Sequence, residues 1–333
     1  MRKFILGLIL FVSVRETAGA KDCHEKQGAL DFGSGTTKAF AALVDVCQKK
    51  VIEVIFEDRL PLALNEALEK SAQKEIPTAI IDQALPQFQT MLQKMQDHDV
   101  KKIHGIATAV FRSAKNGPQV IQRIAKTLQI PVQIISQEKE AELGFWSAIA
   151  QKKLSPKDPI IVWDIGGGSM QMYARRGKTT HVFQGDLASV SFKNKILEDL
   201  QFKDPKQVSS PNPIGTNKDA ALQIAKNHAY IHVSDFFKKE AVTARWIGVG
   251  GVLSMSVQAQ TKKGSAEFTQ AELDKTLRER VFLRDEEINS DYKISDISNL
   301  ALVLGYMQAL QIRKVETAQA SLGQGLLLYN MHH

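Results

Sequence analysis

After an apolar leader, the chain opens with strand-like segments and then changes to helices separated by short strands. Apolar or alternating runs of about four to eight residues indicate strands, whereas apolar residues spaced by three or four indicate helices. The first half is predicted to contain strands at Ala29–Gly33, Lys38–Val46, Lys49–Phe56, Lys102–Ala107 and Val132–Ile135 and helices at Leu64–Ser71, Thr78–Asp97, Gln119–Leu128 and Glu138–Gln151. Pro86 lies inside the second of these helices, where it predicts a kink or a later start.

A second half follows the Pro-bearing link Leu154–Pro159 and repeats this architecture. Its predicted strands are Ile160–Asp164, Gln171–Ala174, Thr179–Phe183 and Arg245–Val249, and its predicted helices are Phe192–Leu200, Asp219–Phe237, Glu272–Arg280, Ser295–Gln311 and Leu322–Leu328. Because each half opens with a strand–turn–strand unit, we expect a duplicated α/β fold with two domains and a cleft between them. The expected domains are residues 21–153 and 154–333, and the last helix is a candidate to pack back on the first domain.

The first 20 residues have the features of a targeting segment. Arg2 and Lys3 form a basic start, Phe4–Val14 is an apolar run, and Ala18–Ala20 are the small residues of a cleavage site. The pattern predicts a secretory signal peptide over residues 1–20, cleaved after its last residue. A membrane anchor is the alternative, but a spanning helix needs about 20 apolar residues. We therefore expect a periplasmic or secreted protein with no membrane partner after cleavage.

Charge is modestly positive and spread along the chain. The net charge of the whole sequence is +7, and loss of residues 1–20 removes three cations and one anion, which leaves 40 basic and 35 acidic residues and a net charge of +5. A positive field of this size favours anionic ligands. Basic pairs such as Lys49-Lys50 and Arg175-Arg176 are dispersed rather than gathered in one stripe, so nucleic acid is not an expected partner.

The two cysteines, Cys23 and Cys47, flank the first two predicted strands. A hairpin that turns near Ser34-Gly35 pairs residues whose numbers sum to about 70, and the two cysteines meet that condition. An oxidising compartment permits a disulfide. We expect a Cys23–Cys47 disulfide at the open end of this hairpin, with two unpaired thiols as the alternative.

Two Gly-rich turns, Asp31–Lys38 and Asp164–Gln171, each follow an apolar strand, and each lies near the start of one half. Glycine lets backbone N–H groups approach a ligand closely, and successive N–H groups form an anion nest. The candidate phosphate-binding residues of these turns are Gly33, Ser34, Gly35, Thr36, Thr37, Lys38, Gly166, Gly167, Gly168 and Ser169. One such turn alone is more simply a tight hairpin. Two turns at corresponding places indicate a phosphate site.

Asp31 and Asp164 end the strands that precede the two turns. Because carboxylates repel bare phosphate, we expect these two to hold hydrated Mg²⁺ or to orient water. A third Gly turn, at Gly250-Gly251, follows a strand and precedes a helix. It is a further candidate for phosphate binding, and a close strand–helix junction is the alternative.

Five motifs follow one another along the chain, at Asp31–Lys38, Ile106–Asn116, Ile134–Leu143, Asp164–Gln171 and Leu322–Leu327. In this order they resemble the exopolyphosphatase and guanosine pentaphosphate phosphatase (Ppx/GppA) family, whose second loop reads Asp-Ile-Gly-Gly-Gly-Ser-Thr-Glu. The resemblance covers nearly the whole mature chain. It implies two actin-like (ribonuclease H-like) domains around an interdomain cleft, and hydrolysis of a terminal phosphoanhydride.

The same resemblance assigns roles to individual residues. Glu140 takes the position of the catalytic base, and an ordinary first-turn Glu facing the helix dipole is the alternative. Arg112 is implied to clamp phosphoryl oxygens, with a surface ion pair as the alternative. The implied cofactor is Mg²⁺ near Asp164 and Asp31. The implied partner is polyphosphate or a phosphorylated nucleotide, and a homodimer is left open.

Departures from the family pattern are concentrated in the loops. Gln171 stands where the family has Glu, and Lys38 replaces an Arg, which keeps the charge but loses the guanidinium fork. Gly35 replaces Asn, and Lys139 replaces the first Glu of a pair. We expect an exported phosphohydrolase that uses Mg²⁺-assisted water attack. Because of Gln171, a non-catalytic polyphosphate or phosphonucleotide binding protein is the alternative, and a kinase or ATPase of the same superfamily is a third hypothesis.

Overall fold

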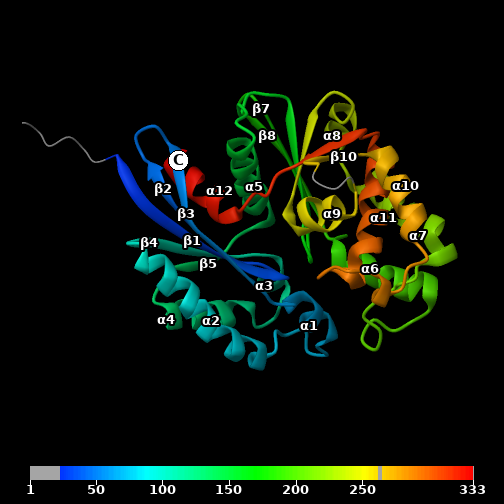
Figure 1. The fold of residues 1–333 in the computed structure, drawn as a ribbon, viewed down its shortest axis with the longest axis horizontal. Coiled ribbons are helices and arrows are strands. Elements are labelled where there is room, and N and C mark those ends of the chain that lie inside the picture. Colours follow the sequence, from blue (N-terminus) through cyan, green and yellow to red (C-terminus); the bar gives the residue numbers. More distant parts are fainter. Residues whose placement is uncertain (1–22, 262–264, 333) are drawn as a thin grey trace, which may run out of the picture.

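The computed structural model describes residues 23–261 and 265–332, and the predicted signal peptide lies outside them. Figure 1 shows this part of the chain as two α/β halves side by side, each built on one sheet. The five-stranded sheet has the order β3-β2-β1-β4-β5, and the six-stranded sheet has the order β10-β11-β9-β6-β7-β8. In both, the first strand pairs antiparallel with the next strand and parallel with a later one. The predicted two-domain α/β fold is confirmed.

The first sheet is formed by β1 (His24–Phe32), β2 (Thr36–Asp45), β3 (Lys50–Pro61), β4 (Lys102–Ala107) and β5 (Val132–Ile134). Its helices are α1 (Leu64–Lys70), α2 (Thr78–Asp97), α3 (Ala109–Ser113) and α4 (Gly117–Leu128). The α2 helix is continuous across Pro86. It packs its apolar stripe on the sheet, where the rings of Phe88 and Phe32 meet edge to face at 5.1 Å, because one face of an amphipathic helix must be buried.

The second sheet is formed by β6 (Ile160–Ile165), β7 (Met170–Arg176), β8 (Thr179–Gly185), β9 (Arg245–Val249), β10 (Glu267–Thr269) and β11 (Lys314–Thr317). Its helical segments are α6 (Ser189–Lys195), the π-helical turn η1 (Ile196–Leu200), the short turn η2 (Gly215–Asn217), α7 (Lys218–His232), α8 (Asp235–Glu240), the π-helical turn η3 (Val252–Val257), α9 (Gln258–Gln260), α10 (Gln270–Arg280), the short turn η4 (Asp285–Glu287) and α11 (Lys293–Leu310). The long helices lie on the outer side of this half (Figure 1).

One predicted helix is wrong: the segment Asp219–Phe237 is two helices. The chain leaves α7 at Val233, which takes an extended conformation and is buried in the second core. Ser234 then takes the extended conformation of an N-cap, and α8 begins at the next residue. The extended backbone at these two residues therefore interrupts the predicted helix.

The first hairpin carries the predicted disulfide. Its register pairs His24 with Asp45 and Asp31 with Lys38, one residue tighter than the predicted sum of 70, because Gly33 N–H bonds back to Thr36 and closes a short turn. Cys23 and Cys47 lie just beyond the last pair, with their Cα atoms 5.4 Å apart, and are joined. The disulfide prediction is confirmed.

Helices α5 (Gln137–Gln151) and α12 (Leu322–His332) pack against each other between the two sheets. Along the chain α5 follows the first sheet, yet its side chains lie in a core with β6 and β7, where the tilted rings of Phe145 and Tyr173 have their centroids 5.0 Å apart. In turn α12 ends the chain but packs on β1 and β2 (Figure 1). The predicted domain boundary at residue 153 stays a prediction, and these two helices pack across it.

Two glycines allow α12 to approach so closely. A Cβ at Gly325 would lie 2.0 Å from the carbonyl oxygen of Leu143 in α5, and a Cβ at Gly323 would lie 2.9 Å from the Cβ of Phe40 in β2. The buried Ser147 hydroxyl donates to Gln324 Oε1 at 2.8 Å across the same contact. The motif Leu322–Leu327 is therefore a packing motif in this fold, which seats one helix on both halves.

Candidate active site

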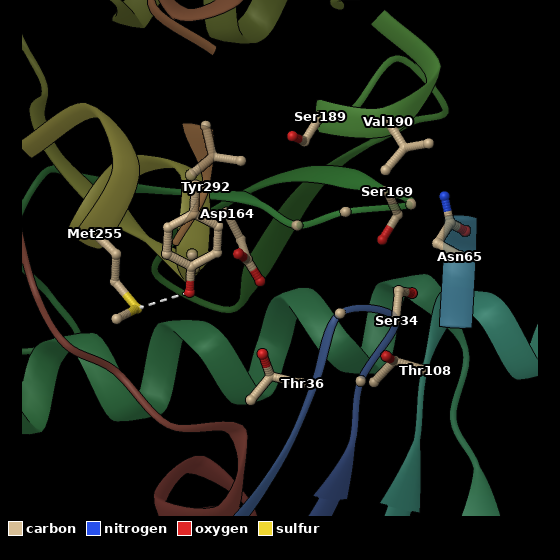
Figure 2. Close-up of a pocket in the computed structure, with 18 of the residues that line it drawn as sticks. Ser34, Thr36, Asn65, Thr108, Asp164, Ser169, Ser189, Val190, Met255 and Tyr292 are labelled. Carbon is tan, nitrogen blue, oxygen red and sulfur yellow. Dashed lines mark hydrogen bonds between the residues drawn. The ribbon is translucent and has the colours of Figure 1, made fainter. Parts of the chain in front are cut away.

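A cleft of about 710 Å³ lies between the two halves and contains most of the predicted site. The predicted residues that line it are Asp31, Gly33, Ser34, Gly35, Thr36, Lys38, Glu140, Asp164, Gly166, Gly167, Gly168, Ser169, Gly250 and Gly251. Figure 2 shows Ser34 of the first loop and Ser169 of the second on the same side of this space. Two predicted residues, Thr37 and Arg112, are not part of the lining. Thr37 is fully buried, because side chains alternate along β2 and its neighbours face the cleft.

The two Gly-rich loops lie so close across the cleft that a side chain added to the second would meet the first loop and α1. A Cβ at Gly167 would lie 3.7 Å from the Cβ of Ser34, and a Cβ at Gly168 would lie 2.8 Å from Asn65 Oδ1. Within the described residues, the backbone N–H groups of Ser34, Gly35, Gly167 and Gly168 donate no hydrogen bond. Two pairs of successive free N–H groups at a Gly-rich turn are the donors of an anion nest.

Each loop is closed by the same kind of bond. Gly33 N–H donates to Thr36 O at 3.2 Å, and Gly166 N–H donates to Ser169 O at 2.9 Å. The second loop is also tied to α6, whose first N–H groups need acceptors: Ser189 N–H bonds to Gly166 O, and the next residue bonds to Gly167 O. Because its carbonyls are committed to the helix, this loop offers its N–H groups to a ligand.

Three carboxylates are buried at the base of the cleft: Asp31 is 4 % exposed, Glu140 is 7 % exposed and Asp164 is 9 % exposed. Burial raises the pKa of Asp31 to about 6 against the opposing charge of Lys38, and it raises the pKa of Asp164 to about 6 in the same way. Burial also raises the pKa of Glu140 to about 7, with Arg112 opposing and both aspartates adding. The carboxylates therefore repel one another, and a bound cation would relieve this repulsion.

Glu140 is held at the start of α5. Ser136 caps this helix by accepting a bond from Lys139 N–H at 3.1 Å, which places Glu140 in the first turn. Arg112 Nη1 lies 2.8 Å from Glu140 Oε2 and also donates to the carbonyl oxygen of Ile135 at 2.9 Å. The guanidinium thus joins the end of β5 to the carboxylate. Its predicted role as a phosphate clamp stays a prediction.

The donor set fits Mg²⁺. Asp31 Oδ1 is buried and has no hydrogen-bond partner within the described residues, and the carboxylate of Asp164 lies in the same cleft. Hard oxygen ligands of this kind are the ones that Mg²⁺ takes in proteins. Asp31 and Asp164 would hold the ion, in line with the predicted metal pair, which stays a prediction.

The third Gly turn packs directly against one of these carboxylates. Gly250 has φ +80°, and a Cβ there would lie 2.1 Å from Asp164 Oδ1. Only glycine adopts this backbone conformation at no steric cost. The missing side chain at Gly250 therefore leaves room for the Asp164 carboxylate, and the phosphate-binding role of this turn stays a prediction.

Several lining residues were not singled out by the sequence pattern. Asn65 in α1 donates its backbone N–H to Ser34 O at 3.0 Å, so α1 supports the first loop. Ser189 donates its hydroxyl to Asn299 Oδ1 at 2.8 Å on the opposite wall. Tyr292 and Met255 lie together at the other end of the cleft (Figure 2). These residues come from separate helices and connections, so no local motif marks them.

Two α/β halves of the same topology, each presenting a Gly-rich turn to one cleft, define an actin-like phosphate-binding protein. Within that class, this chain belongs to the Ppx/GppA phosphatase family, whose sequence model matches residues 43–333. The prediction of a phosphoanhydride hydrolase of this family is therefore confirmed.

Solved structures agree with the fold. The chain is similar to an Aquifex aeolicus Ppx/GppA family member, with a TM-score of 0.69, 14% identity, and coverage of 93% of this chain and 98% of the other. It is similar to an exopolyphosphatase from Cytophaga hutchinsonii, with a TM-score of 0.70, 17% identity, and coverage of 92% and 98%. An exopolyphosphatase-like protein gives a TM-score of 0.72 at 16% identity, with coverage of 92% and 98%. At these identities the similarity shows the fold alone.

Proposed function

We propose that this protein removes the terminal phosphate from polyphosphate or from a guanosine pentaphosphate-like nucleotide, and that it does so outside the cytoplasm. Family membership supports a phosphatase. The observation that carries the proposal is the buried Glu140 carboxylate in a cleft that also holds free loop N–H groups.

The proposed reaction is attack of water on the terminal phosphorus, with cleavage of the bond to the bridging oxygen. The N–H groups of Ser34, Gly35, Gly167 and Gly168, together with the Lys38 ammonium, hold the phosphoryl oxygens. Glu140 accepts the proton of the attacking water, for which a pKa of about 7 suits neutral pH. Bound Mg²⁺ supplies neutralisation of the phosphate charge. In reactions of this class, positioning and electrostatic stabilisation provide most of the rate.

Export is supported by two observations. The leader over residues 1–20 has the pattern of a signal peptide, and the Cys23–Cys47 disulfide is of the kind that persists in an oxidising compartment. None of the helices in the described part of the chain is long and apolar enough to span a bilayer.

Phosphate release from a substrate panel tests the proposal. The panel contains inorganic polyphosphate, guanosine pentaphosphate and ATP, each with Mg²⁺. Glu140→Gln is expected to lower turnover by at least about 100-fold, because general-base catalysis contributes about that much or more. Glu138→Gln is the matched control, since Glu138 lies in the same first turn but is exposed. Full turnover by Glu140→Gln would overturn the assignment of the base.

One observation favours a second candidate function. Gln171 provides a neutral amide opposite Asp164 where the family has a carboxylate, which suits a protein that binds polyphosphate or a phosphorylated nucleotide without cleaving it. This candidate predicts saturable binding of polyphosphate with no phosphate released over hours. Release that depends on Glu140 would exclude it.

A further inference from the structure

Gln171 ends the second loop motif and has no part in the reaction described above. It lies directly opposite Asp164 in the β6–β7 ladder and is 1 % exposed. Residues opposite each other in an antiparallel pair project their side chains to the same face, with Cβ atoms about 5 Å apart. The amide of Gln171 is therefore a close and buried neighbour of the Asp164 carboxylate.

The amide is only half satisfied. Its Nε2 donates to Ser169 Oγ at 3.0 Å, which fixes the side chain to a residue that lines the cleft. Its Oε1 is buried and accepts no hydrogen bond within the described part of the chain. A buried oxygen without a partner is unusual, and here it belongs to the residue that pairs with Asp164, one of the two carboxylates that would hold a cation.

The negative charge around this oxygen does not balance a divalent ion. Glu140 is already paired with Arg112. Asp31 and Asp164 contribute two negative charges, and Lys38 is close enough to act on both, so the group carries a net charge of 1 − 2 = −1. A carboxylate at position 171 would make it −2, equal and opposite to Mg²⁺. With fewer protein charges, Mg²⁺ is bound through one or two carboxylates together with substrate phosphates.

We propose that Gln171 prevents the empty cleft from retaining Mg²⁺, so that this protein takes up the ion only together with the phosphates of its substrate. The amide of Gln171 has nearly the same shape as a glutamate carboxylate but adds no negative charge to the site. This inference rests on the proposed function, because it assumes that the bound substrate brings phosphates to Asp31 and Asp164. It makes Gln171 the residue that sets the order in which metal and substrate bind.

The test is Mg²⁺ binding to the substrate-free protein by isothermal titration calorimetry at pH 8, with Mn²⁺ and electron paramagnetic resonance as a second readout. The wild-type protein is expected to show no saturable binding up to millimolar Mg²⁺. Gln171→Glu is expected to bind one ion at least about tenfold more tightly, in the range by which single ligand-shell changes alter metal affinity. Gln308→Glu in α11 is the matched control, since Gln308 also has a buried oxygen without a partner in the described residues.

Two results would overturn the inference: tight binding of one Mg²⁺ by the wild-type protein alone, or unchanged affinity in folded Gln171→Glu. If that variant does not fold, as judged by circular dichroism, Gln171→Asp takes its place in the same titration. Neither measurement depends on phosphate release. If the protein binds its ligand without hydrolysing it, the proposed hydrolysis is wrong, but the titrations still test the role of Gln171.

Discussion

Replacement of Arg112 by methionine would separate two roles for this guanidinium. In the structure Arg112 lies behind Glu140, within 2.8 Å of its carboxylate, and does not line the cleft. If Arg112 tunes the base, its loss changes the pH at which Glu140 becomes ionised. If it clamps phosphate instead, its loss weakens substrate binding at every pH.

The size and sign of the expected change in the pKa of Glu140 follow from its ion pair with Arg112. Glu140 has a pKa of about 7, raised by burial and held down by Arg112. An opposite charge at this range lowers a carboxyl pKa by about 1–3 units. Without Arg112 the pKa of Glu140 should therefore rise by an amount in this range. Because only the ionised carboxylate accepts a proton, the acid limb of kcat/KM should move upward by the same amount.

The assay is phosphate release from the best panel substrate between pH 5.5 and 10. We expect Arg112→Met to lose most activity at pH 7 and to recover it at about pH 9. Arg112→Lys should keep the limb close to the wild-type position. Arg123→Met is the control, because Arg123 forms an exposed ion pair with Asp82 far from the cleft. An unchanged acid limb with a raised KM would refute the tuning role and favour the clamp.

Three further predictions concern stability, each measured by urea unfolding. Gly250→Ala should cost about 2 kcal/mol or more, because alanine at φ +80° is strained and its Cβ would collide with Asp164; a cost within 0.5 kcal/mol would contradict the packing described. Cys47→Ser should cost about 3 kcal/mol, since the disulfide closes a loop with a sequence separation of 24, and reductant should destabilise the wild-type protein but not the variant. Glu66→Gln should cost about 3 kcal/mol by leaving the ammonium of Lys193, 2 % exposed, without its charged partner; Lys193→Met should cost less, and the reverse order would count against a buried ion pair.

The sequence predicts the parts of this site that are local in the chain. Each Gly-rich loop and the aspartate that begins it form a motif of eight residues. In both motifs the aspartate ends an apolar strand and is followed by glycines and hydroxyl side chains. The disulfide could also be predicted from the sequence, because the turn of a hairpin determines which residues of its two strands lie opposite each other.

Features that depend on distant contacts were not predictable. The strands β10 and β11 have 3 and 4 residues, too few for an alternating pattern to emerge, and they exist because they extend a sheet whose centre is formed elsewhere in the chain. The support of the first loop by Asn65 is a tertiary contact of a short helix. The motif that contains Arg112 can be recognised in the sequence, but the contact between Arg112 and Glu140 depends on how α3 and α5 lie relative to each other.

The placement of α12 has a consequence for how the chain is made. The first sheet can begin to form soon after its strands leave the ribosome, but the helix that covers β1 and β2 is synthesised only after all strands of the second sheet. Until then, the inner face of that sheet lacks its cover, and Leu326 and Leu327 have not yet joined Ala29 and Phe40. The first half of the nascent chain therefore stays incomplete until α12 has been made. Removal of α12 should therefore impair the half that is synthesised first.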